Sequence, residues 1–541
     1  MAFEAPPLKT AAAVELSNFG SAARRAGSVN DDAYLTRIGK KPVLKRHFGF
    51  LTILGFGCTV IITWEGSLIL FLSGLQNGGP AALVYGFLII FVGTVSVFAT
   101  LSELVSMAPT SGGQYHWVSM LAPPAYRNAC SYVLGWVELT GWQALVASGG
   151  YVTGTLIQGV ILLCNPSYIN RMANWHGTML FWAIILFAYF VNTALGSLLA
   201  KFGGVLLIIH ILGFFAVLLP LIILGEHTDS SAVFETWLNL GHWPTLGLSV
   251  CIGMQGHVFA FLGADAAIHM SEEIRNAAVV VPRSLMTGLC INGVLGWVMI
   301  ITTLYCVGDI DAALAENPLY PFMAIFRKAV GSTAGAAAMA SIVIIAATSA
   351  TTGSLASASR VYFAFARDRG LPGWKLLRQV NQRTNIPSYA VLTTALIAIL
   401  LSLVNFGGKA AFNGVISISI AGLFGSYLFA AVLLLYRRLR GDIYPADPSL
   451  DLTNTVGTRL TWGPWYLKGA LGTANNIFSC IYLCFILFFS FWPGDSQVNL
   501  ENMNWSILVT TLVVILSTLY YLGWARKTYT GPVIEINELR S

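Results

Sequence analysis

Two apolar stretches of the chain hold residues that can bind a small charged molecule. The first reads GFGCTVIITWEGSLILFLSGL and places Trp64 and Glu65 among glycines, and the second, QGHVFAFLGADAAIHMSEEIR, holds Asp265 among glycines and histidines. A carboxylate near the middle of a membrane span costs at least about 2.5 kcal/mol to insert, so it marks a functional site by default. Glu65 is therefore our first candidate, either to pair with a substrate ammonium group or to take up a coupling proton. A structural carboxylate that bridges two helices is the alternative.

Aromatic side chains in the same stretches suggest a pocket for a cation. Phe259 and Phe261, with Trp64 opposite them, can supply the faces of such a pocket. An ammonium group over an aromatic ring gains about 0.5 to 2 kcal/mol, depending on how dry the site is. Packing or gating is the alternative for both phenylalanines. We predict binding more firmly for Phe259 than for Phe261.

Glycines in the two stretches predict interrupted helices. Gly263 lets the chain unwind at mid-membrane, and the backbone amides near Thr63 and Gly66 then stand at the start of a half-helix, where they can hold a carboxylate. Unwound backbone at this depth is tolerated only where it lines a cavity. The two stretches therefore predict a binding site between them.

Five further residues suit proton coupling, ion coupling or gating. His210 lies in the apolar run KFGGVLLIIHILGFF, and a histidine titrates near pH 6.5 unless perturbed, which suits a proton relay as well as a hydrogen bond between helices. Thr351 and Thr352, in ATSATTGSLASASR, can coordinate a sodium ion, although small residues also allow close helix packing, which we favour. Asp265 and His269 are four residues apart and share a helix face. We predict that this pair forms a hydrogen-bond network at the inner gate.

Membrane-spanning helices must position these residues, because the chain has 541 residues of which 56% are hydrophobic and only 10% are charged. A soluble protein would be about 25% charged. A bilayer core about 30 Å thick needs about 20 apolar residues per helix, and we count about twelve such runs, which predicts an all-α integral membrane protein. The runs lie near 48–75, 82–106, 128–163, 178–198, 203–224, 247–270, 284–307, 332–362, 387–405, 412–436, 472–492 and 505–524.

The polar ends and the basic residues predict the topology. We expect a disordered tail at 1–46, a transmembrane domain at 47–525 and a second tail at 526–541. Placing both tails in the cytosol puts nearly all of the 30 Lys and Arg residues on the inner side or at helix margins, as the positive-inside rule requires. The net charge of +6 follows from this topology, and no basic and aromatic pattern indicates nucleic acid binding. The eight cysteines form no CxxC pair, and we expect no catalytic residue, cofactor or metal site.

The interrupted runs are the first and the sixth, so they lie five helices apart. Interrupted helices in corresponding positions of two halves indicate a secondary transporter built from inverted repeats, with its site near the middle of the membrane. The sequence thus predicts a transporter.

Several motifs resemble those of a known family. NGGPAALVYG (77–86), SELVSMAPTSGGQYHWVSMLAPP (102–124), GADAAIHMSEEIRNAAVVVPRS (263–284) and FARDRGLP (365–372) are similar to signatures of fungal permeases in the amino acid/choline transporter family. That family belongs to the amino acid–polyamine–organocation superfamily. The resemblance covers roughly residues 45–525. It implies a LeuT-like fold, with five plus five inverted helices followed by two more.

The resemblance also implies roles for single residues. Phe259 matches the aromatic residue that closes over bound substrate, and His210 lies near the position where proton-coupled members carry a lysine that exchanges protons. Glu103 lies in the motif near the inner mouth, where we expect it to hold an inner loop by hydrogen bonds. The family's residue at the position of Glu65 is not always acidic, so Glu65 marks a subgroup.

These observations predict an alternating-access permease that imports an amine-bearing small solute across the lipid bilayer, coupled to H⁺ rather than to Na⁺. Choline or a related quaternary amine is the first expectation, and γ-aminobutyrate or another amino acid is the second. We favour the plasma membrane over the vacuolar membrane, with both termini cytosolic. The alternatives of another class are a membrane enzyme, for which the sequence lacks a nucleophile with its base, and a non-transporting sensor, for which the tails are short.

Overall fold

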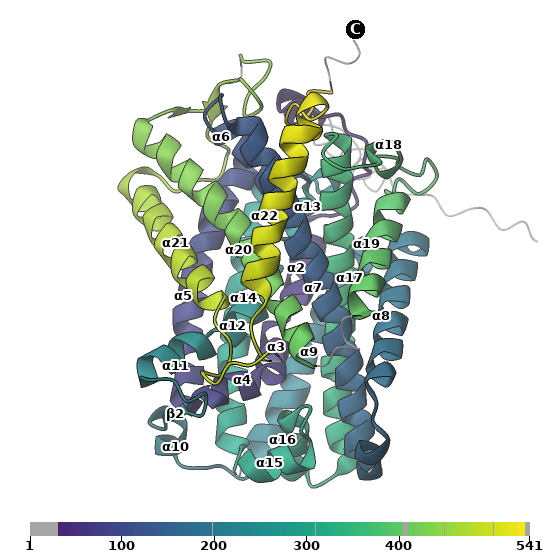
Figure 1. Ribbon diagram of the computed structural model, residues 1–541, viewed down its shortest axis with the longest axis vertical. Helices are drawn as coiled ribbons and strands as arrows, with labels where there is room; N and C mark the ends of the chain where they lie inside the picture. Colours follow the sequence, from purple (N-terminus) through teal and green to yellow (C-terminus); the bar gives the residue numbers. More distant parts are fainter. Residues whose placement is uncertain are drawn as a thin grey trace, which may run out of the picture.

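The computed structural model describes residues 31–535 except for 197–198, 309, 404–408, 448 and 501. Helices make up nearly all of the regular structure in this part of the chain, and long helices run side by side along the longest axis (Figure 1). The all-α prediction is confirmed for these residues. Two short strand pairs are present: β1 (Asn77–Gly78) runs antiparallel to β2 (Leu238–Asn239), and β3 (Ile443–Tyr444) runs parallel to β4 (Leu460–Thr461).

Twelve apolar helical spans account for the predicted runs within the described residues. Ten of them are long and apolar enough to cross a bilayer, and the other two are shorter apolar helices. The first span is α2 (Phe50–Ile61) with α3 (Thr63–Ile69), and the sixth is α11 (Leu246–Gly253) with α12 (Gln255–Ala260) and α13 (Ala266–His269). The others are α5 (Gly79–Met107), α7 (Arg127–Cys164), α8 (Asn174–Ala194), α9 (Leu199–Leu224), α14 (Ala277–Cys306), α17 (Thr333–Arg367), α19 (Ser388–Ser402), α20 (Lys409–Arg440), α21 (Gly469–Ser490) and α22 (Ser506–Gly523).

Short elements connect these spans. The connecting helices are α4 (Phe71–Gln76), α6 (Gly113–Leu121), η1 (Pro166–Arg171), α10 (Ser230–Phe234), η3 (Ser271–Glu273), α15 (Ile310–Glu316), α16 (Pro321–Val330), α18 (Trp374–Leu377) and η5 (Ala525–Lys527).

Local sequence signals set the ends of several helices. Ser332 precedes α17, and its hydroxyl accepts a hydrogen bond from the amide of Gly335 at 3.3 Å, as a helix N-cap does. Pro80 lies in the first turn of α5, where its missing N–H is not needed. Gly331 ends α16 with φ of +63°, a left-handed conformation that glycine adopts without steric cost. The spans are thus bounded by residues suited to those places.

The first span is broken at Ile62. This residue has φ of 39° and ψ of 50°, so it ends α2 and precedes α3 in a left-handed conformation. Such a conformation is a genuine outlier for a β-branched side chain. The surrounding packing must therefore hold the break in place, because the local sequence does not favour it.

The sixth span is broken between Ala260 and Ala266. Within the break, Gly263 has φ of +83°, and a Cβ atom there would lie 3.1 Å from Val60 and 3.2 Å from Leu145. Both the conformation and the lack of space therefore require glycine. The two predicted interruptions are confirmed, and their positions in the first and sixth spans are those that the LeuT-like prediction requires.

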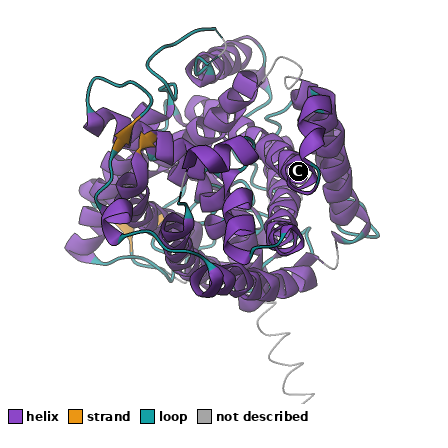
Figure 2. Cartoon of the chain, turned by 90° about the horizontal axis from the view of Figure 1, so that it is seen from below, coloured by secondary structure: helices purple, strands orange, loops and turns teal. Residues whose placement is uncertain are grey.

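Both described ends of the chain lie on one face of the bundle. The amide of Glu535 donates to the carbonyl of Gly39 at 2.8 Å, so the two terminal segments touch. We call this end of the bundle the terminal face, and the opposite end, which carries α10, α15 and α16, the distal face (Figure 1). Figure 2 looks along the bundle from the distal side and shows helices end-on, packed around one another.

The segment before the first span is more ordered than the sequence predicted. Residues 1–30 and 536–541 of the predicted tails lie outside the described residues. Residues 31–37 form a helical segment, and Lys40 is 1% exposed, so the predicted disorder does not extend over 31–46. In the second tail, Tyr529 is also 1% exposed. Both segments pack against the terminal face.

Candidate functional site

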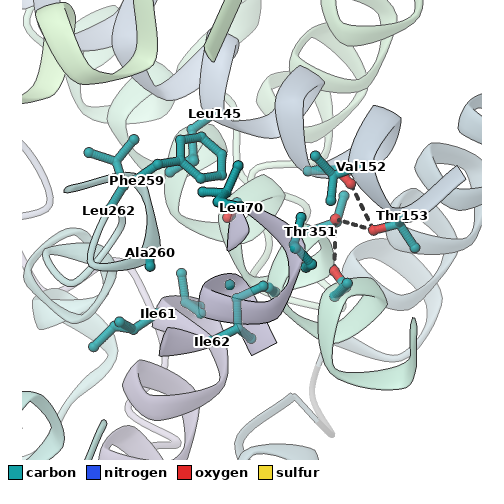
Figure 3. A pocket seen from close by; sticks show the side chains of 17 residues that line it. Ile61, Ile62, Leu70, Leu145, Val152, Thr153, Phe259, Ala260, Leu262 and Thr351 are labelled. Atoms are coloured by element: carbon teal, nitrogen blue, oxygen red, sulfur yellow. Dashed lines mark hydrogen bonds between the residues drawn. The ribbon is translucent and has the colours of Figure 1, made fainter. Parts of the chain in front are cut away.

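A cavity of about 50 Å³ lies between the two helix breaks. Its walls come from the broken first and sixth spans and from α7 and α17 (Figure 3). Ile62 from the first break and Ala260 from the second line it together. Strained backbone and a buried cavity thus meet at one place, as expected of a mid-membrane binding site.

Three hydroxyl groups supply the polar side-chain atoms of this pocket. Thr153 on α7, and Thr351 and Ser354 on α17, line it, and the two threonine Oγ1 atoms are 3.4 Å apart. Thr153 donates its hydroxyl to the carbonyl of Gly149 at 2.7 Å, and Thr351 donates to Ala347 at 2.9 Å. Each hydroxyl has only one hydrogen to donate, so both threonines present acceptor lone pairs to the pocket.

Two of the predicted substrate residues line the pocket. Gly66 lies on the α3 side, and Phe259 contributes an aromatic wall next to Leu145 (Figure 3). The amide of Gly66 donates to the carbonyl of Ile62 at 2.7 Å, so this N–H is already used within the first span. Among the described residues that line the pocket, none carries a charged side chain.

The other predicted substrate residues lie around the pocket rather than in its wall. Thr63 joins the two breaks, because its hydroxyl donates to the carbonyl of Ala260 at 3.2 Å. Phe261 is fully buried and stacks on Phe91, with ring centroids 5.9 Å apart and planes 7° apart. Gly263 supplies the turn of the second break. Their predicted binding roles remain predictions.

Glu65 points away from this pocket, toward α9. Its Oε1 lies 2.8 Å from Nδ1 of His210, and both side chains are buried. They border a second cavity of about 10 Å³ together with Trp64 and Ser349. Within the described structure, Oε2 of Glu65 and Nε2 of His210 have no hydrogen-bond partner. Two residues that the sequence suggested separately for coupling therefore form one pair.

Nδ1 of His210 has two polar neighbours. Nε1 of Trp64 lies 3.2 Å from the same Nδ1 atom of His210, and an indole N–H can only donate. If Nδ1 accepts from Trp64, the contact with Glu65 needs a proton on the carboxyl group. If Nδ1 carries the proton instead, it donates to a Glu65 carboxylate. In either arrangement one hydrogen lies between Oε1 of Glu65 and Nδ1 of His210.

Thr351 and Thr352, the predicted ion ligands, have different surroundings. Thr351 lines the main pocket, as described above. Thr352 donates its hydroxyl to the carbonyl of Thr348 at 2.8 Å, and its own carbonyl accepts from Nδ2 of Asn192 at 3.0 Å. The structure therefore places Thr351, but not Thr352, in the pocket wall.

A buried polar network lies on the terminal side of the second break. Nε2 of His269 is 3.2 Å from Oδ2 of Asp265 and accepts from Nε1 of Trp142 at 3.1 Å. Gln114 donates to the same Asp265 oxygen at 3.0 Å, and Glu138 accepts from the amide of Tyr115. The predicted pair is thus joined by residues from α6 and α7.

Ion pairs surround this network on the terminal face. Arg367 holds Glu272 through two hydrogen bonds of 2.8 Å, and Arg360 holds Glu273 at 2.8 Å. Burial raises the pKa of Glu272, but the attraction of Arg367 outweighs it and lowers this pKa to about 2. The pairs join the segment after the sixth span to α17.

Two further ion pairs involve residues at or just outside the ends of the first span, α5, α17 and α20. Lys40, just before the first span, lies 2.7 Å from Oδ1 of Asp368, and both are buried. Burial raises the pKa of Asp368, but Lys40 and Arg367 together bring it below its usual range. Glu103, predicted at the inner gate, accepts from Arg438 on α20, which links α5 to α20.

Sequence reasoning missed several of these residues. Thr153 and Ser354 are ordinary small residues in apolar helices, and no local pattern distinguishes them from packing residues. Asp368 lies in the FARDRGLP motif, which was a usable signal, but its partner Lys40 is 328 residues away in sequence. Contacts over such a separation follow only from the fold.

Comparison with known proteins agrees with this architecture. The profile of the amino acid permease family matches residues 48–514. The chain is similar to the choline transporter of Saccharomyces cerevisiae, at 28% identity over 90% of this chain and 83% of that protein. It is also similar to the amino-acid permease BAT1 of Arabidopsis thaliana (27% identity; 93% and 96% covered) and to the GABA-specific permease of S. cerevisiae (25% identity; 95% and 87% covered). With its two broken spans, its buried pocket and a match across most of its length, the chain belongs to the amino acid permease family, within the amino acid–polyamine–organocation superfamily.

Proposed function

We propose that the protein imports a small solute with a primary amine, most closely an amino acid such as γ-aminobutyrate, by alternating access. The observation that carries this proposal is the pocket between the two helix breaks, whose side-chain polar atoms are hydroxyl oxygens. Thr153 and Thr351 both use their hydrogens on their own helices, so they offer acceptors to a bound molecule. A primary ammonium group has three N–H donors to satisfy such acceptors.

Choline is the second candidate for the solute. The sequence favoured choline because Glu65 stood beside aromatic residues, but Glu65 contacts His210 and does not line the pocket. The quaternary ammonium of choline has no N–H, so its charged group cannot donate to the threonine oxygens, and only its single hydroxyl can. Phe259 in the pocket wall and the similarity to a choline transporter keep choline as the second candidate.

We further propose that the Glu65–His210 pair carries a coupling proton. The pair is in hydrogen-bond contact, is buried, and borders a cavity between the first span, α9 and α17. Movement of the first span against α9 would change the contact between the two side chains and thus the affinity for that proton. Na⁺ is the second candidate for the coupling ion. The hydroxyls of Thr351 and Thr352 donate to helix carbonyls and keep oxygen lone pairs that can coordinate it.

The topology completes the proposal. We place the terminal face in the cytosol, since the basic loop between α17 and α19 lies there and the positive-inside rule applies to it. We propose the plasma membrane as the location, a transmembrane domain at 47–525, and cytosolic segments on either side. Rocking of the broken spans against their neighbours then exposes the pocket to each face in turn.

Uptake in proteoliposomes tests the function. Purified protein should accumulate labelled γ-aminobutyrate, or another primary amino acid in a panel, more strongly than labelled choline, and an inward proton gradient should increase uptake. Preference for choline would overturn the substrate proposal. Absence of both uptake and counterflow with every solute in the panel would instead favour a sensor.

A further inference from the structure

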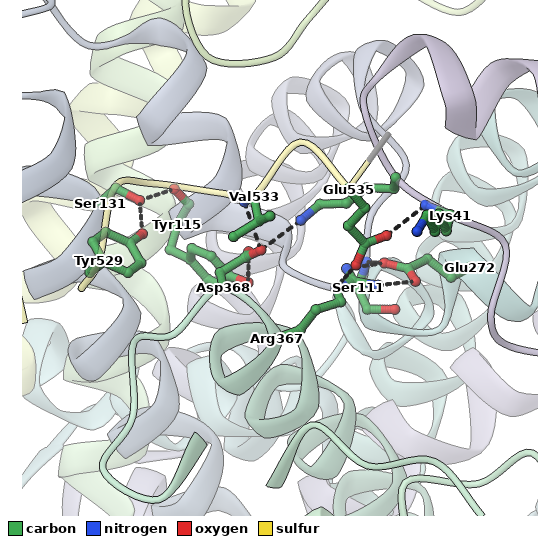
Figure 4. Close-up of polar contacts among 11 residues, drawn as sticks. Lys41, Ser111, Tyr115, Ser131, Glu272, Arg367, Asp368, Tyr529, Val533 and Glu535 are labelled. Atoms are coloured by element: carbon green, nitrogen blue, oxygen red, sulfur yellow. Dashed lines mark hydrogen bonds and ion pairs between the residues drawn. The ribbon is translucent and has the colours of Figure 1, made fainter. Parts of the chain in front are cut away.

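The segment after α22 turns back across the terminal face. We call residues 529–535 the C-terminal strap. We propose that the strap is a latch which holds the terminal face closed and must undock before the pocket opens to that side. The inference rests on the proposed transport cycle only in requiring such an opening. Figure 4 shows the polar contacts that the strap makes.

The first end of the strap is fixed to α7. Tyr529 is buried, and its hydroxyl lies 2.7 Å from Oγ of Ser131. Its ring packs against Tyr132 on α7 and Phe365 on α17, with ring centroids 5.1 and 5.9 Å away. Because Ser131 also donates to the carbonyl of Tyr115 at 2.8 Å, this end is joined to α6 as well.

A glycine turn directs the strap across the face. Gly531 has φ of +93°, and a Cβ atom at this position would lie 3.1 Å from Oγ of Ser119 and 3.2 Å from Oδ1 of Asn128. An L side chain would be strained in this conformation and would also crowd both neighbours. The path of the strap therefore depends on one residue that makes no charged contact.

The middle of the strap binds the buried Asp368. The amide of Val533 donates to Oδ1 of Asp368 at 3.0 Å, the same oxygen that contacts Lys40. The other oxygen of Asp368 accepts from the hydroxyl of Tyr115 at 2.9 Å. The strap thus completes the set of donors around a buried carboxylate at the terminal face.

The last described residue of the strap, Glu535, binds both sides of the mouth. Its Oε2 accepts from the amide of Lys41 at 2.6 Å, and its amide donates to Gly39, so it holds the segment that leads into the first span. Its Oε1 lies 3.5 Å from Nε of Arg367 on α17. Arg367 in turn binds Glu272, just after the sixth span.

These contacts make the strap a bridge between elements that must separate. The pocket is enclosed by the two broken spans on one side and by α7 and α17 on the other. Opening toward the terminal face moves one set away from the other. Gly39 and Lys41 belong to the segment joined to the first span, whereas Ser131 and Arg367 belong to α7 and α17. Separation therefore breaks strap contacts on at least one side.

A matched pair of glycine variants tests the latch. Gly531→Ala should undock the strap, whereas Gly523→Ala, at the end of α22 with no heavy atom within 4 Å of the added Cβ, should leave it in place. In the purified full-length protein, we expect hydrogen exchange in peptides covering Phe50–Ile61 and Ala266–His269 to become roughly tenfold faster with Gly531→Ala and to stay unchanged with Gly523→Ala. Unchanged exchange in both variants, with the strap itself undocked, would overturn the proposal.

A separately added peptide controls for misfolding of a variant that lacks the strap. A chain truncated after residue 527 should show the same faster exchange, and a synthetic peptide of residues 528–541 should reverse it, while the same peptide with Gly531→Ala should not. Failure of the unaltered peptide to restore protection, in a truncated chain whose remaining peptides exchange as in the full chain, would contradict the latch.

Solute efflux separates this inference from the proposed function. We expect efflux from proteoliposomes to rise severalfold with Gly531→Ala, because inward opening is made easier. Faster exchange without any solute movement would support the latch and refute the transport proposal. Normal transport with unaltered exchange and efflux in the Gly531→Ala variant would refute the latch alone.

Discussion

Oε1 of Glu65 lies 2.8 Å from Nδ1 of His210, and the two residues belong to spans that are far apart in sequence. The contact joins the half-helix after the first break to α9. It also removes the carboxylate from the wall of the main pocket. The pocket proposed for substrate and the pair proposed for the coupling proton therefore lie apart, one on each side of the first span.

Glu65→Gln should abolish the dependence of uptake on the proton gradient. Glutamine keeps the size of the side chain and can hydrogen-bond to His210, but it cannot take up a proton. Initial uptake rates measured between pH 5 and pH 8 should become nearly flat. Asp447→Asn, in an exposed loop, serves as the control and should keep the slope of the unaltered protein. An unchanged pH profile in Glu65→Gln would exclude the pair as the proton carrier.

Thr351→Val should weaken the binding of a primary amine. It removes an acceptor oxygen from the pocket, and hydrogen bonds to a charged group contribute about 1.5 to 3 kcal/mol, so we expect KM to rise roughly tenfold or more. Thr352→Val is the matched control, because Thr352 does not line the pocket. KM for both variants is measured from uptake at increasing solute concentration. Equal effects of the two substitutions would argue for an ion site that uses both hydroxyls.

Gly263→Ala should destabilise the protein by about 1 to 3 kcal/mol. The added Cβ meets Val60 and Leu145 at just over 3 Å, and the backbone of this residue is left-handed. Gly57→Ala, in the helical part of the first span, is a useful comparison because nothing lies within 4 Å of its Cβ, so it should be neutral or slightly stabilising. Thermal unfolding in detergent would show the difference. A melting temperature of Gly263→Ala equal to that of Gly57→Ala would mean that the second break needs no glycine.

Stability at acidic pH should depend on Glu272. Its pKa is about 2 in the folded protein, below the usual value of 4.5, so the carboxylate contributes stability that is complete above pH 4.5 and is lost as the pH falls toward 2. Glu272→Gln should lower the free energy of unfolding at neutral pH by about 3 kcal/mol, since Arg367 loses its main partner. The melting temperature of this variant should also change less than that of the unaltered protein between pH 5 and pH 3. Parallel curves for the two proteins would show that other carboxylates dominate acid unfolding.

The sequence predicted the spans and their two breaks because both leave local signals. Long apolar runs identify the helices, and glycines with ionisable residues in the middle of a run identify the breaks. Ile62 is the exception, since nothing in its type predicts a left-handed conformation. The sequence located the first break through the neighbouring Thr63, Glu65 and Gly66, and not through Ile62 itself.

Side-chain direction and tail packing could not be predicted in the same way. Phe259 and Phe261 were placed in one pocket, yet Phe261 packs against Phe91 because two residues along an irregular helix end point to different sides. Lys41 lies in the segment predicted to be disordered, and Glu535 lies in the second tail, for which the sequence predicted no packing. Their order comes from the partners that the folded bundle brings to them.

The left-handed isoleucine at the first break has a consequence for how the molecule changes shape. A β-branched side chain in this conformation carries about 1 to 3 kcal/mol of backbone strain. Packing by the neighbouring residues must stabilise the break against this strain. Replacing Ile62 by glycine would relieve the backbone strain and keep the helix break, because glycine adopts this conformation without steric cost. We expect this variant to have a higher melting temperature and a lower transport rate. Without the strain, the conformation seen here would be more stable relative to the other states of the transport cycle.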